Sequence, residues 1–245
     1  MNKIDIGANV IRFVDVDSTN RVALSSKHFP SGTIFIAKTQ SSGLGRHNRK
    51  WISPKGGLYL SLLLKDLPNI IEYQMASILC GFCVVKTCKD FLLDGHFSIK
   101  WPNDIIIEDK KICGILAQTV VSGEKSRGAI GIGINVNSNL EDFQFPLCDN
   151  IISLKELTDN VIPLSSFEKK LIIYIKSIFK NNIRNTFIEN LPDINDLLYK
   201  KGEQGKLLIR GEVHKYRIMG ILEDCSISVE DSHGNQLAYS ICEFL

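Results

Sequence analysis

A polar loop at residues 40–51 is the first stretch whose side chains could do chemistry. Its glycines, Gly43 and Gly45, would let the backbone approach a ligand closely. Positive charge and an aromatic ring, which could together wrap a nucleotide, come from Arg46, Arg49, Lys50 and Trp51. A solvated basic hairpin loop explains the same residues equally well. A Walker loop is excluded, because the sequence has no G-x-x-x-x-G-K-[ST].

A second segment, FSIKWPND, could place a lysine at the end of a strand. Strand alternation puts Phe97 and Ile99 on one face and Lys100 on the other, where it would point toward a cleft or solvent. A lysine held there, just before a stiff proline, could neutralise a phosphate or carboxylate oxygen. Spacing alone favours an ordinary surface lysine. Asp104 could help to hold a metal ion or a substrate amine, or could only form a turn with Asn103.

Two strand-like runs contain glycines that could face a ligand: GILAQ from Gly114 and GAIGIGINVN from Gly128. The second run superficially resembles a dinucleotide-binding fingerprint, but its glycines lie inside a strand and do not open a helix. Glycine inside a strand more often marks the close approach of a ligand or of another strand. Asn135, near the end of this run, could hydrogen-bond a ligand or cap a turn.

Composition and absent motifs narrow the function classes. The chain has 245 residues, of which 44% are hydrophobic, and its 29 basic and 27 acidic residues leave a net charge of +2. A nucleic-acid binder would show a basic stripe or a much higher charge, so this class is not indicated. The sequence contains no G-x-S-x-G and no H-E-x-x-H, and its five histidines lack metal-ligand spacing. Hydrolases and metalloenzymes are therefore disfavoured.

Cysteine usage and targeting signals indicate the cytoplasm. The seven cysteines are irregularly spaced, and the C-x-x-C at Cys80 and Cys83 lies inside an apolar helical run. Buried free thiols in a reducing compartment are expected, at Cys148 as at the others. The N-terminus lacks the apolar region of a signal peptide. No apolar run approaches the ~20 residues of a membrane span.

The elements that must position these residues form an α+β part followed by a β part. Alternation and apolar runs predict strands at residues 10–16, 33–38, 57–64, 97–101, 104–108, 112–121 and 127–136. Helices are expected at residues 21–28, after candidate caps at 17–20, at 71–93, and, as one or two helices, at 164–190. Because the strands mostly form hairpins, the sheet should be mixed or antiparallel.

The last part of the chain has a different texture. Short strands at residues 206–210, 215–221, 226–230 and 236–241 alternate with turn residues. This pattern predicts a small all-β barrel of ~45 residues. Two domains are therefore expected, at residues 1–195 and 196–245.

Taken in order, these segments resemble the biotin protein ligase family. The matching motifs are DSTN at 17–20, GLGRHNRKW at 43–51 with Gln40 before it, KWPND at 100–104, KICGIL at 111–116 and GIGINVN at 131–137. KWPND is the family's most specific signature, and five motifs in the right order weigh more than any one. The resemblance implies a class II synthetase-like biotin/lipoate ligase catalytic domain and a small C-terminal SH3-like β-barrel.

Two positions depart from the family's loop pattern, G-R-G-R-x-G-R-x-W. Leu44 stands where arginine is usual, and Asn48 stands where glycine is usual. Leu44 would meet biotin through its backbone only, and Asn48 would reduce the flexibility of the loop. We expect an altered affinity and not a loss of activity. Because the first ligase strand starts near residue 10, the chain resembles the monofunctional form, without the N-terminal helix-turn-helix and without repressor activity.

The resemblance implies a reaction in two steps. The biotin carboxylate attacks the α-phosphorus of Mg-ATP, which gives biotinyl-AMP and pyrophosphate, and a lysine of a biotin carboxyl carrier protein then attacks the mixed anhydride and releases AMP. Lys100 and Arg46 are the implied catalytic residues. The implied biotin-binding residues are Ser18, Thr19, Asn20, Gln40, Gly43, Leu44, Gly45, Arg46, Lys100, Gly114, Leu116, Gly131 and Gly133. The implied nucleotide-binding residues are Arg46, Arg49, Trp51, Asn103, Lys111 and Asn135, and Asp104 is the candidate ligand of Mg²⁺.

The expected partner is the carrier protein of acetyl-CoA carboxylase or a related carboxylase. Binding to DNA or to a membrane is not expected. The sequence leaves open whether the chain forms a homodimer. A lipoate–protein ligase shares the fold and reaction type, but the complete KWPND signature and the small β domain favour biotin. A non-catalytic biotin or nucleotide sensor is the other alternative, and the presence of Lys100 and Arg46 argues against it. Because the intermediate hydrolyses in water, a closing loop is expected.

Overall fold

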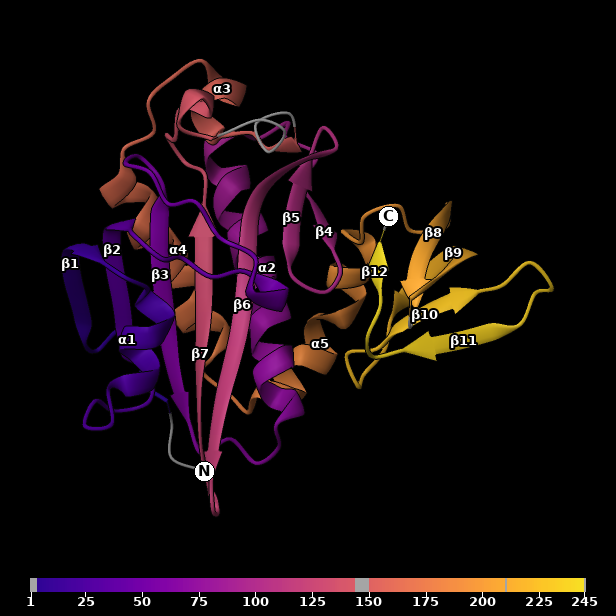
Figure 1. The fold of residues 1–245 in the computed structure, drawn as a ribbon, viewed down its shortest axis with the longest axis horizontal. Helices are drawn as coiled ribbons and strands as arrows, with labels where there is room; N and C mark the ends of the chain where they lie inside the picture. Colours follow the sequence, from indigo (N-terminus) through magenta and orange to yellow (C-terminus); the bar gives the residue numbers. More distant parts are fainter. Residues whose placement is uncertain (1–3, 144–149, 210, 245) are drawn as a thin grey trace.

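The computed structural model describes residues 4–143, 150–209 and 211–244. Its centre is a seven-stranded sheet in the order β1-β2-β3-β7-β6-β5-β4 (Figure 1). Only β1 and β2 run parallel, and the other neighbours in this sheet are antiparallel, which confirms the expected mixed α+β class. The strands are β1 (Val10–Val16), β2 (Ile34–Gln40), β3 (Leu58–Lys65), β4 (Ser98–Lys100), β5 (Asp104–Ile107), β6 (Lys110–Ser122) and β7 (Lys125–Ile134).

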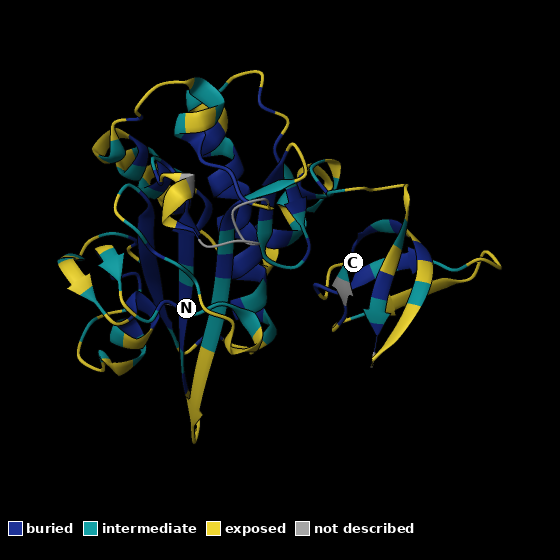
Figure 2. Ribbon diagram, turned by 45° about the horizontal axis from the view of Figure 1, so that its top comes forward, coloured by how far each residue is buried: buried dark blue, intermediate teal, exposed yellow. Residues whose placement is uncertain are grey.

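Helices cover the two faces of this sheet unequally. The long helix α2 (Ile71–Phe91) packs against β6 and β7, and its outer side carries α4 (Leu164–Ile178) and α5 (Ile183–Asp196). The short helix α1 (Thr19–Ser25) lies on the other face, where it contacts β2, β3 and β7. The strands between these layers are largely buried (Figure 2). The α1 face is only partly covered by helix, and this leaves room for a site.

Strand alternation decides which residues of β7 reach that open face. Successive side chains of a strand point to opposite faces. Gly128 lies against the ring of Tyr73 from α2, so the even positions of β7 face the α2 layer. The odd positions Gly131 and Gly133 therefore face the α1 side, where they form a floor without side chains.

The C-terminal strands form a second, five-stranded antiparallel sheet in the order β11-β10-β9-β8-β12, which fits the expected SH3-like barrel. It stands beside α5 and the β4 edge of the large sheet (Figure 1). The indole N–H of Trp101 donates to the carbonyl oxygen of Cys225 at 2.9 Å, and its ring packs edge-on against Phe244. The strands are β8 (Gln204–Ile209), β9 (Glu212–Ile221), β10 (Ile227–Glu230), β11 (Gln236–Tyr239) and β12 (Glu243–Phe244).

The region at 164–190 forms two helices, one of the two expected alternatives. Two other details differ from the expectations. An additional helix α3 (Leu154–Thr158) begins with a capping box of Ser153 and Glu156. Helix α1 begins at Thr19, and its N-cap residue Ser18 makes no side-chain capping bond. The expected side-chain cap is wrong there: the first helical N–H, that of Thr19, donates to Gln40 Oε1 at 2.8 Å, and the Ser18 N–H donates to the Asp17 carboxylate at 2.6 Å.

The expected free, buried thiols are confirmed for Cys80, Cys83, Cys88, Cys113, Cys225 and Cys242. Cys148 lies outside the described residues. Among the helices of the described ranges, none combines the length and the apolar character that crossing a membrane requires. Helix α5 ends at Asp196, and a domain boundary at 195/196 remains our proposal.

Candidate active site

A pocket of about 640 Å³ opens on the α1 side of the sheet. Its walls come from the start of α1, the loop at 43–51, strands β4 to β7 and the end of the barrel. All expected site residues except Gly43 and Asn135 line it: Ser18, Thr19, Asn20, Gln40, Leu44, Gly45, Arg46, Arg49, Trp51, Lys100, Asn103, Asp104, Lys111, Gly114, Leu116, Gly131 and Gly133. The fold thus brings together motifs from both ends of a stretch of more than a hundred residues.

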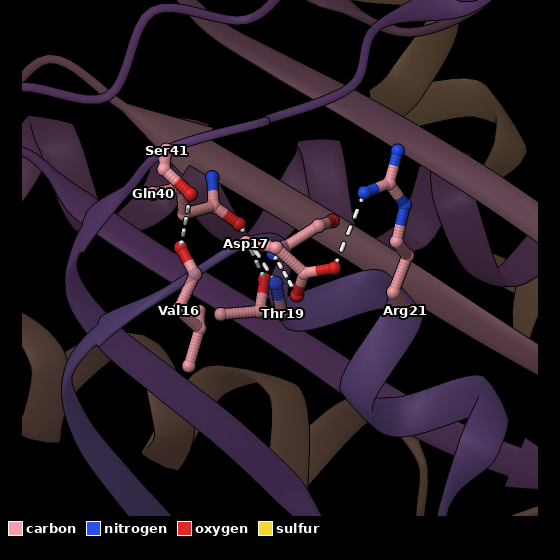
Figure 3. Close-up of polar contacts among 7 residues, drawn as sticks. Val16, Asp17, Thr19, Arg21, Gln40 and Ser41 are labelled. Carbon is pink, nitrogen blue, oxygen red and sulfur yellow. Dashed lines mark hydrogen bonds and ion pairs between the residues drawn. The ribbon is translucent and has the colours of Figure 1, made fainter.

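Neutral polar side chains form one wall as a connected network. Gln40 Oε1 accepts from the backbone N–H of Thr19 at 2.8 Å and from its hydroxyl at 3.1 Å (Figure 3). Gln40 Nε2 donates to Ser53 at 2.9 Å. The hydroxyl of Ser61, fully buried in β3, lies 2.8 Å from Thr19 Oγ1 and 2.6 Å from Asn20 Oδ1. This network holds its members in place before any ligand binds.

Asn20 is held on every side. Its Nδ2 donates to the carbonyl of Leu116 at 3.2 Å and to Gln118 Oε1 at 2.8 Å, while its Oδ1 lies beside Ser61. Its amide group rests on Gly131: a methyl group at that glycine would lie only 2.8 Å from Asn20 Cγ. The glycine is therefore required by the close approach of a side chain, as strand glycines often are.

Trp51 lies on the remaining part of the glycine floor. A methyl group at Gly133 would lie 2.6 Å from its Cε2, and one at Gly114 would lie 2.9 Å from its Cζ3. These glycines are direct partners across β6 and β7. The ammonium of Lys111 lies 5.2 Å from the ring centroid. The indole Nε1 is buried and has no hydrogen-bond partner in the described part of the chain.

The loop that carries the arginines is folded into a tight hairpin. Leu44 and Lys50 form an isolated β-bridge, and the N–H of Gly45 donates to the carbonyl of Arg49 at 2.7 Å. Asn48 has a φ of 58°, in the left-handed region. Asparagine enters this region more readily than most residues, which explains how it can stand where the family usually has glycine.

Lys100 points away from the core, as strand alternation predicts. Phe97 and Ile99 are each 2% exposed, whereas Lys100 is half-buried and lines the pocket. Burial lowers the pKa of its ammonium; Asp104 raises the pKa in part, while the neighbouring ammonium of Lys111 lowers it further. The surface-lysine alternative does not fit this placement.

Asp104 forms an ion pair with Lys111, with Oδ1 and Nζ 2.8 Å apart. The carboxylate is thus occupied by a cation inside the pocket. Across the described ranges there is no group of three or more His, Cys, Asp or Glu side chains that could hold a metal ion. The role of Asp104 as a ligand of Mg²⁺ remains a prediction, and its ion pair with Lys111 is the contact that it makes in the ligand-free protein.

Arg46 connects the loop to the opposite wall and to the barrel. Its Nη1 donates to Asn103 Oδ1 at 3.5 Å, a long contact. Cys242, which directly precedes β12, also lines the pocket, and burial raises the pKa of its thiol to about 11, although Arg46 acts in the other direction. The end of the barrel therefore helps to wall the pocket.

Gly43 and Asn135 lie outside the lining. Gly43 has a local packing role, because a methyl group there would lie 2.9 Å from the Ser53 hydroxyl and still closer to the backbone of Trp51. Asn135 is 1% exposed, and its Oδ1 has no partner among the described residues. Its backbone N–H donates to Ile112 at 2.9 Å, so it joins the end of β7 to β6.

Sequence reasoning assigned no role to several residues of the site, among them Ser53, Ser61 and Gln118 in the hydrogen-bonded network and Ile151, Cys242 and Phe244 in the pocket lining. A signal existed for Ser61, which is the only small polar residue in the apolar strand LYLSLLLK. No local signal existed for Cys242 and Phe244, because only the position of the barrel brings them to the pocket.

Comparison with known proteins shows which family the chain is similar to. Residues 10–135 match the family described as the Biotin/lipoate A/B protein ligase family. The bifunctional ligase/repressor BirA of Bacillus spizizenii is 30% identical over 187 residues, which make up 74% of this chain and 57% of that protein. A biotin–[acetyl-CoA-carboxylase] ligase of Paracoccus denitrificans is 31% identical over 125 residues, 49% of this chain and 51% of that protein. The chain thus spans a little over half the length of these relatives.

Solved structures extend the likeness to the whole chain. The biotin protein ligase from Aquifex aeolicus in complex with biotin and ATP has 27% identity and a TM-score of 0.83, and the match covers 97% of this chain and 99% of that one. The family match spans just over half of the 245 residues and contains most of the pocket. On this evidence, the chain belongs to the biotin/lipoate A/B protein ligase family.

Proposed function

We propose that this chain is an ATP-dependent biotin–protein ligase, which forms biotinyl-AMP and transfers the biotinyl group to a lysine of a biotin carboxyl carrier protein. One observation carries the proposal: a single pocket is lined both by a neutral hydrogen-bonding network and by several cationic side chains. The first suits an uncharged ring system, and the second suits two anions that must react with each other. The names of the relatives and the biotin and ATP bound to the Aquifex aeolicus ligase support the same choice.

The neutral part of the pocket would hold the biotin rings. Thr19 and Gln40 offer hydrogen-bonding groups whose positions are set by Ser53 and Ser61. The glycine floor offers a flat surface to which a ring system can approach closely. Mostly apolar pockets with a few well-placed polar groups are typical small-molecule sites.

The cationic part would join the two anionic substrates. The biotin carboxylate and the ATP phosphates repel each other, so their approach requires positive charge between them. Lys100, which lacks an acidic partner in the described ranges, would bridge the carboxylate and the α-phosphate. Arg46 would hold the phosphate of the adenylate, and Arg49, Asn103 and Lys111 line the same pocket. The carboxylate oxygen bonds to the α-phosphorus as the bond to pyrophosphate breaks.

Magnesium would enter with its nucleotide. Mg²⁺ is usually bound by substrate phosphates and one or two protein ligands, not by a protein cage. We therefore treat MgATP as the substrate. The transfer step needs a carrier lysine at the pocket mouth, and we infer that the acceptor is the carrier of a cytoplasmic biotin-dependent carboxylase.

The test is a mass spectrum of a carrier domain incubated with this chain, biotin and MgATP. We expect one added biotinyl group, dependent on ATP, with release of pyrophosphate. The same mixture with lipoate in place of biotin distinguishes the related lipoate ligases. Pyrophosphate release without carrier labelling would limit the activity to adenylation, and neither product would leave a non-catalytic biotin or nucleotide sensor.

A further inference from the structure

The ammonium of Lys100 has an aromatic neighbour in place of an acidic one. Asp104, which lies opposite Lys100 on the neighbouring strand, forms an ion pair with Lys111, with Oδ1 and Nζ 2.8 Å apart. Within the described residues, no hydrogen bond or ion pair involves the Lys100 ammonium. The ring of Tyr199 lies near it instead, with the Lys100 Nζ 5.9 Å from the ring centroid and the Lys200 Nζ 5.1 Å from the same centroid.

Tyr199 is held in this position by its backbone and its hydroxyl. The N–H of Ile99 donates to Leu197 at 2.7 Å, and the N–H of Tyr199 donates to the carbonyl of Ile99 at 2.9 Å. The segment between α5 and β8 thus adds hydrogen bonds to the outer edge of β4. The Tyr199 hydroxyl donates to Asp109 Oδ1, in the turn between β5 and β6, at 2.6 Å. Tyr199 itself does not line the pocket.

An aromatic ring suits a lysine that must bind substrate anions. A carboxylate beside Lys100 would neutralise it and would repel both substrates, whereas a ring face attracts a cation without carrying charge. The other ionisable groups around Lys100 act in opposite directions: Asp104 favours its charged form, while Lys111 and Lys200 oppose it together with burial. A cation–π contact offsets part of this opposition.

We propose that Tyr199 is a positioning residue of the ligase, whose ring keeps the Lys100 ammonium charged and in place without touching substrate. The role of Tyr199 in catalysis rests on the function proposed above. The contact between Tyr199 and Lys100 does not rest on it, because this contact is present in the ligand-free protein. This difference allows the two proposals to be tested separately.

The first measurement is the reactivity of Lys100 toward an amine-modifying anhydride, read by peptide mass spectrometry. Tyr199→Leu removes the ring, and Tyr199→Phe keeps it but removes the bond to Asp109. We expect Lys100 to react about two- to fivefold faster in Tyr199→Leu, the range of an exposed cation–π contact, and at nearly the wild-type rate in Tyr199→Phe.

Tyr174 provides a control that lies outside the pocket, beside a lysine that also forms an ion pair with Asp90 at 3.1 Å. Its ring lies 5.5 Å from the Lys170 ammonium and its hydroxyl donates to Asp90 at 3.0 Å, on α4 and away from the pocket. Tyr174→Leu should change the reactivity of Lys170 and leave Lys100 unchanged. Equal Lys100 reactivity in the wild type and Tyr199→Leu, with melting temperatures preserved, would overturn the proposal whatever the activity.

The second measurement is single-turnover formation of biotinyl-AMP. Tyr199→Leu should slow it about two- to fivefold with Tyr199→Phe close to wild type. In a Lys100→Ala background the leucine substitution should add nothing, because Tyr199 acts through Lys100. A further loss in that background would overturn the positioning role. A wild-type chain that forms no biotinyl-AMP would refute the proposed function, while the reactivity measurement would still decide the contact.

Discussion

Gly131→Ala should damage biotin binding through Asn20, although it adds only one methyl group. The methyl would lie 2.8 Å from Asn20 Cγ and 3.0 Å from Nδ2, where ordinary contact begins near 3.4 Å. The amide group must therefore move by at least about 0.6 Å, the difference between 3.4 and 2.8 Å, because its Oδ1 would lie closer still to the methyl group. Its neighbours cannot easily follow, because Ser61 is fully buried in a central strand.

The cost follows from the hydrogen bonds that this movement strains. Asn20 is bonded to Ser61 at 2.6 Å, to Gln118 at 2.8 Å and to Leu116 at 3.2 Å. Loss of two of these bonds costs about 2 kcal/mol, at about 1 kcal/mol each. These bonds are internal to the ligand-free protein, so the loss falls on the free energy of unfolding, less the gain of about 0.5–1 kcal/mol from replacing a strand glycine with alanine. Biotin affinity should fall as well, because the displaced Asn20 shifts the wall that would hold the biotin rings.

The assay is calorimetric titration with biotin, together with a thermal melt of the ligand-free protein. Gly205→Ala in β8 is the matched control, because a methyl there meets no atom within 4 Å. In an Asn20→Ala background, Gly131→Ala should cause no further loss of melting temperature, since the group with which it collides is gone. An unchanged biotin affinity in Gly131→Ala would refute the placement of biotin on this wall.

Four further outcomes are expected. Lys100→Ala should slow adenylate formation roughly a hundredfold, through the loss of about 3 kcal/mol of transition-state stabilisation. Because burial lowers the pKa of Lys100, the wild-type rate should decrease with rising pH at a pH below the ordinary pKa of lysine. The rate of Lys100→Ala should not show this decrease. Arg46→Gly should still form the adenylate but release it, so that streptavidin blots show labelled albumin beside the carrier; labelling of the carrier alone would contradict the proposed clamp. The loop at 41–50 should become resistant to protease when biotin and ATP are added together, and equal cleavage would argue against closure. With a net charge of only +2, the chain should give no salt-resistant, sequence-specific gel shift.

Much of the site was predictable because its motifs are local. The FSIKWPND segment shows on its own that Lys100 and Ile99 face opposite ways, since strand alternation is a property of the backbone. The glycines of β7 likewise predict that a ligand or another part of the chain approaches this strand closely. The order of the motifs was sufficient to indicate the ligase family.

Other predictions failed or stopped short for physical reasons. The Ser18 side chain does not cap α1, and the first helical N–H, that of Thr19, donates instead to Gln40, a partner 21 residues away that no local pattern supplies. Helix α3 was not anticipated; its capping box of Ser153 and Glu156 was a readable signal, but the helix has only five residues and little periodicity. The expectation that Asn48 restricts the loop stays a prediction; the structure adds that this residue adopts a left-handed conformation, which asparagine tolerates.

The sequence by itself determined which residue types could bind, which faces of the strands they occupy and where the α+β part gives way to a β part. Only the tertiary structure decided which of them meet. Ser61 lies 41 residues from Asn20, and Trp101 lies 124 residues from the Cys225 carbonyl to which it donates. Local periodicity tells which way a side chain points, but a partner so distant is set by how sheets, helices and barrel pack. The walls of the pocket, and the aromatic neighbour of Lys100, therefore follow from packing and not from pattern.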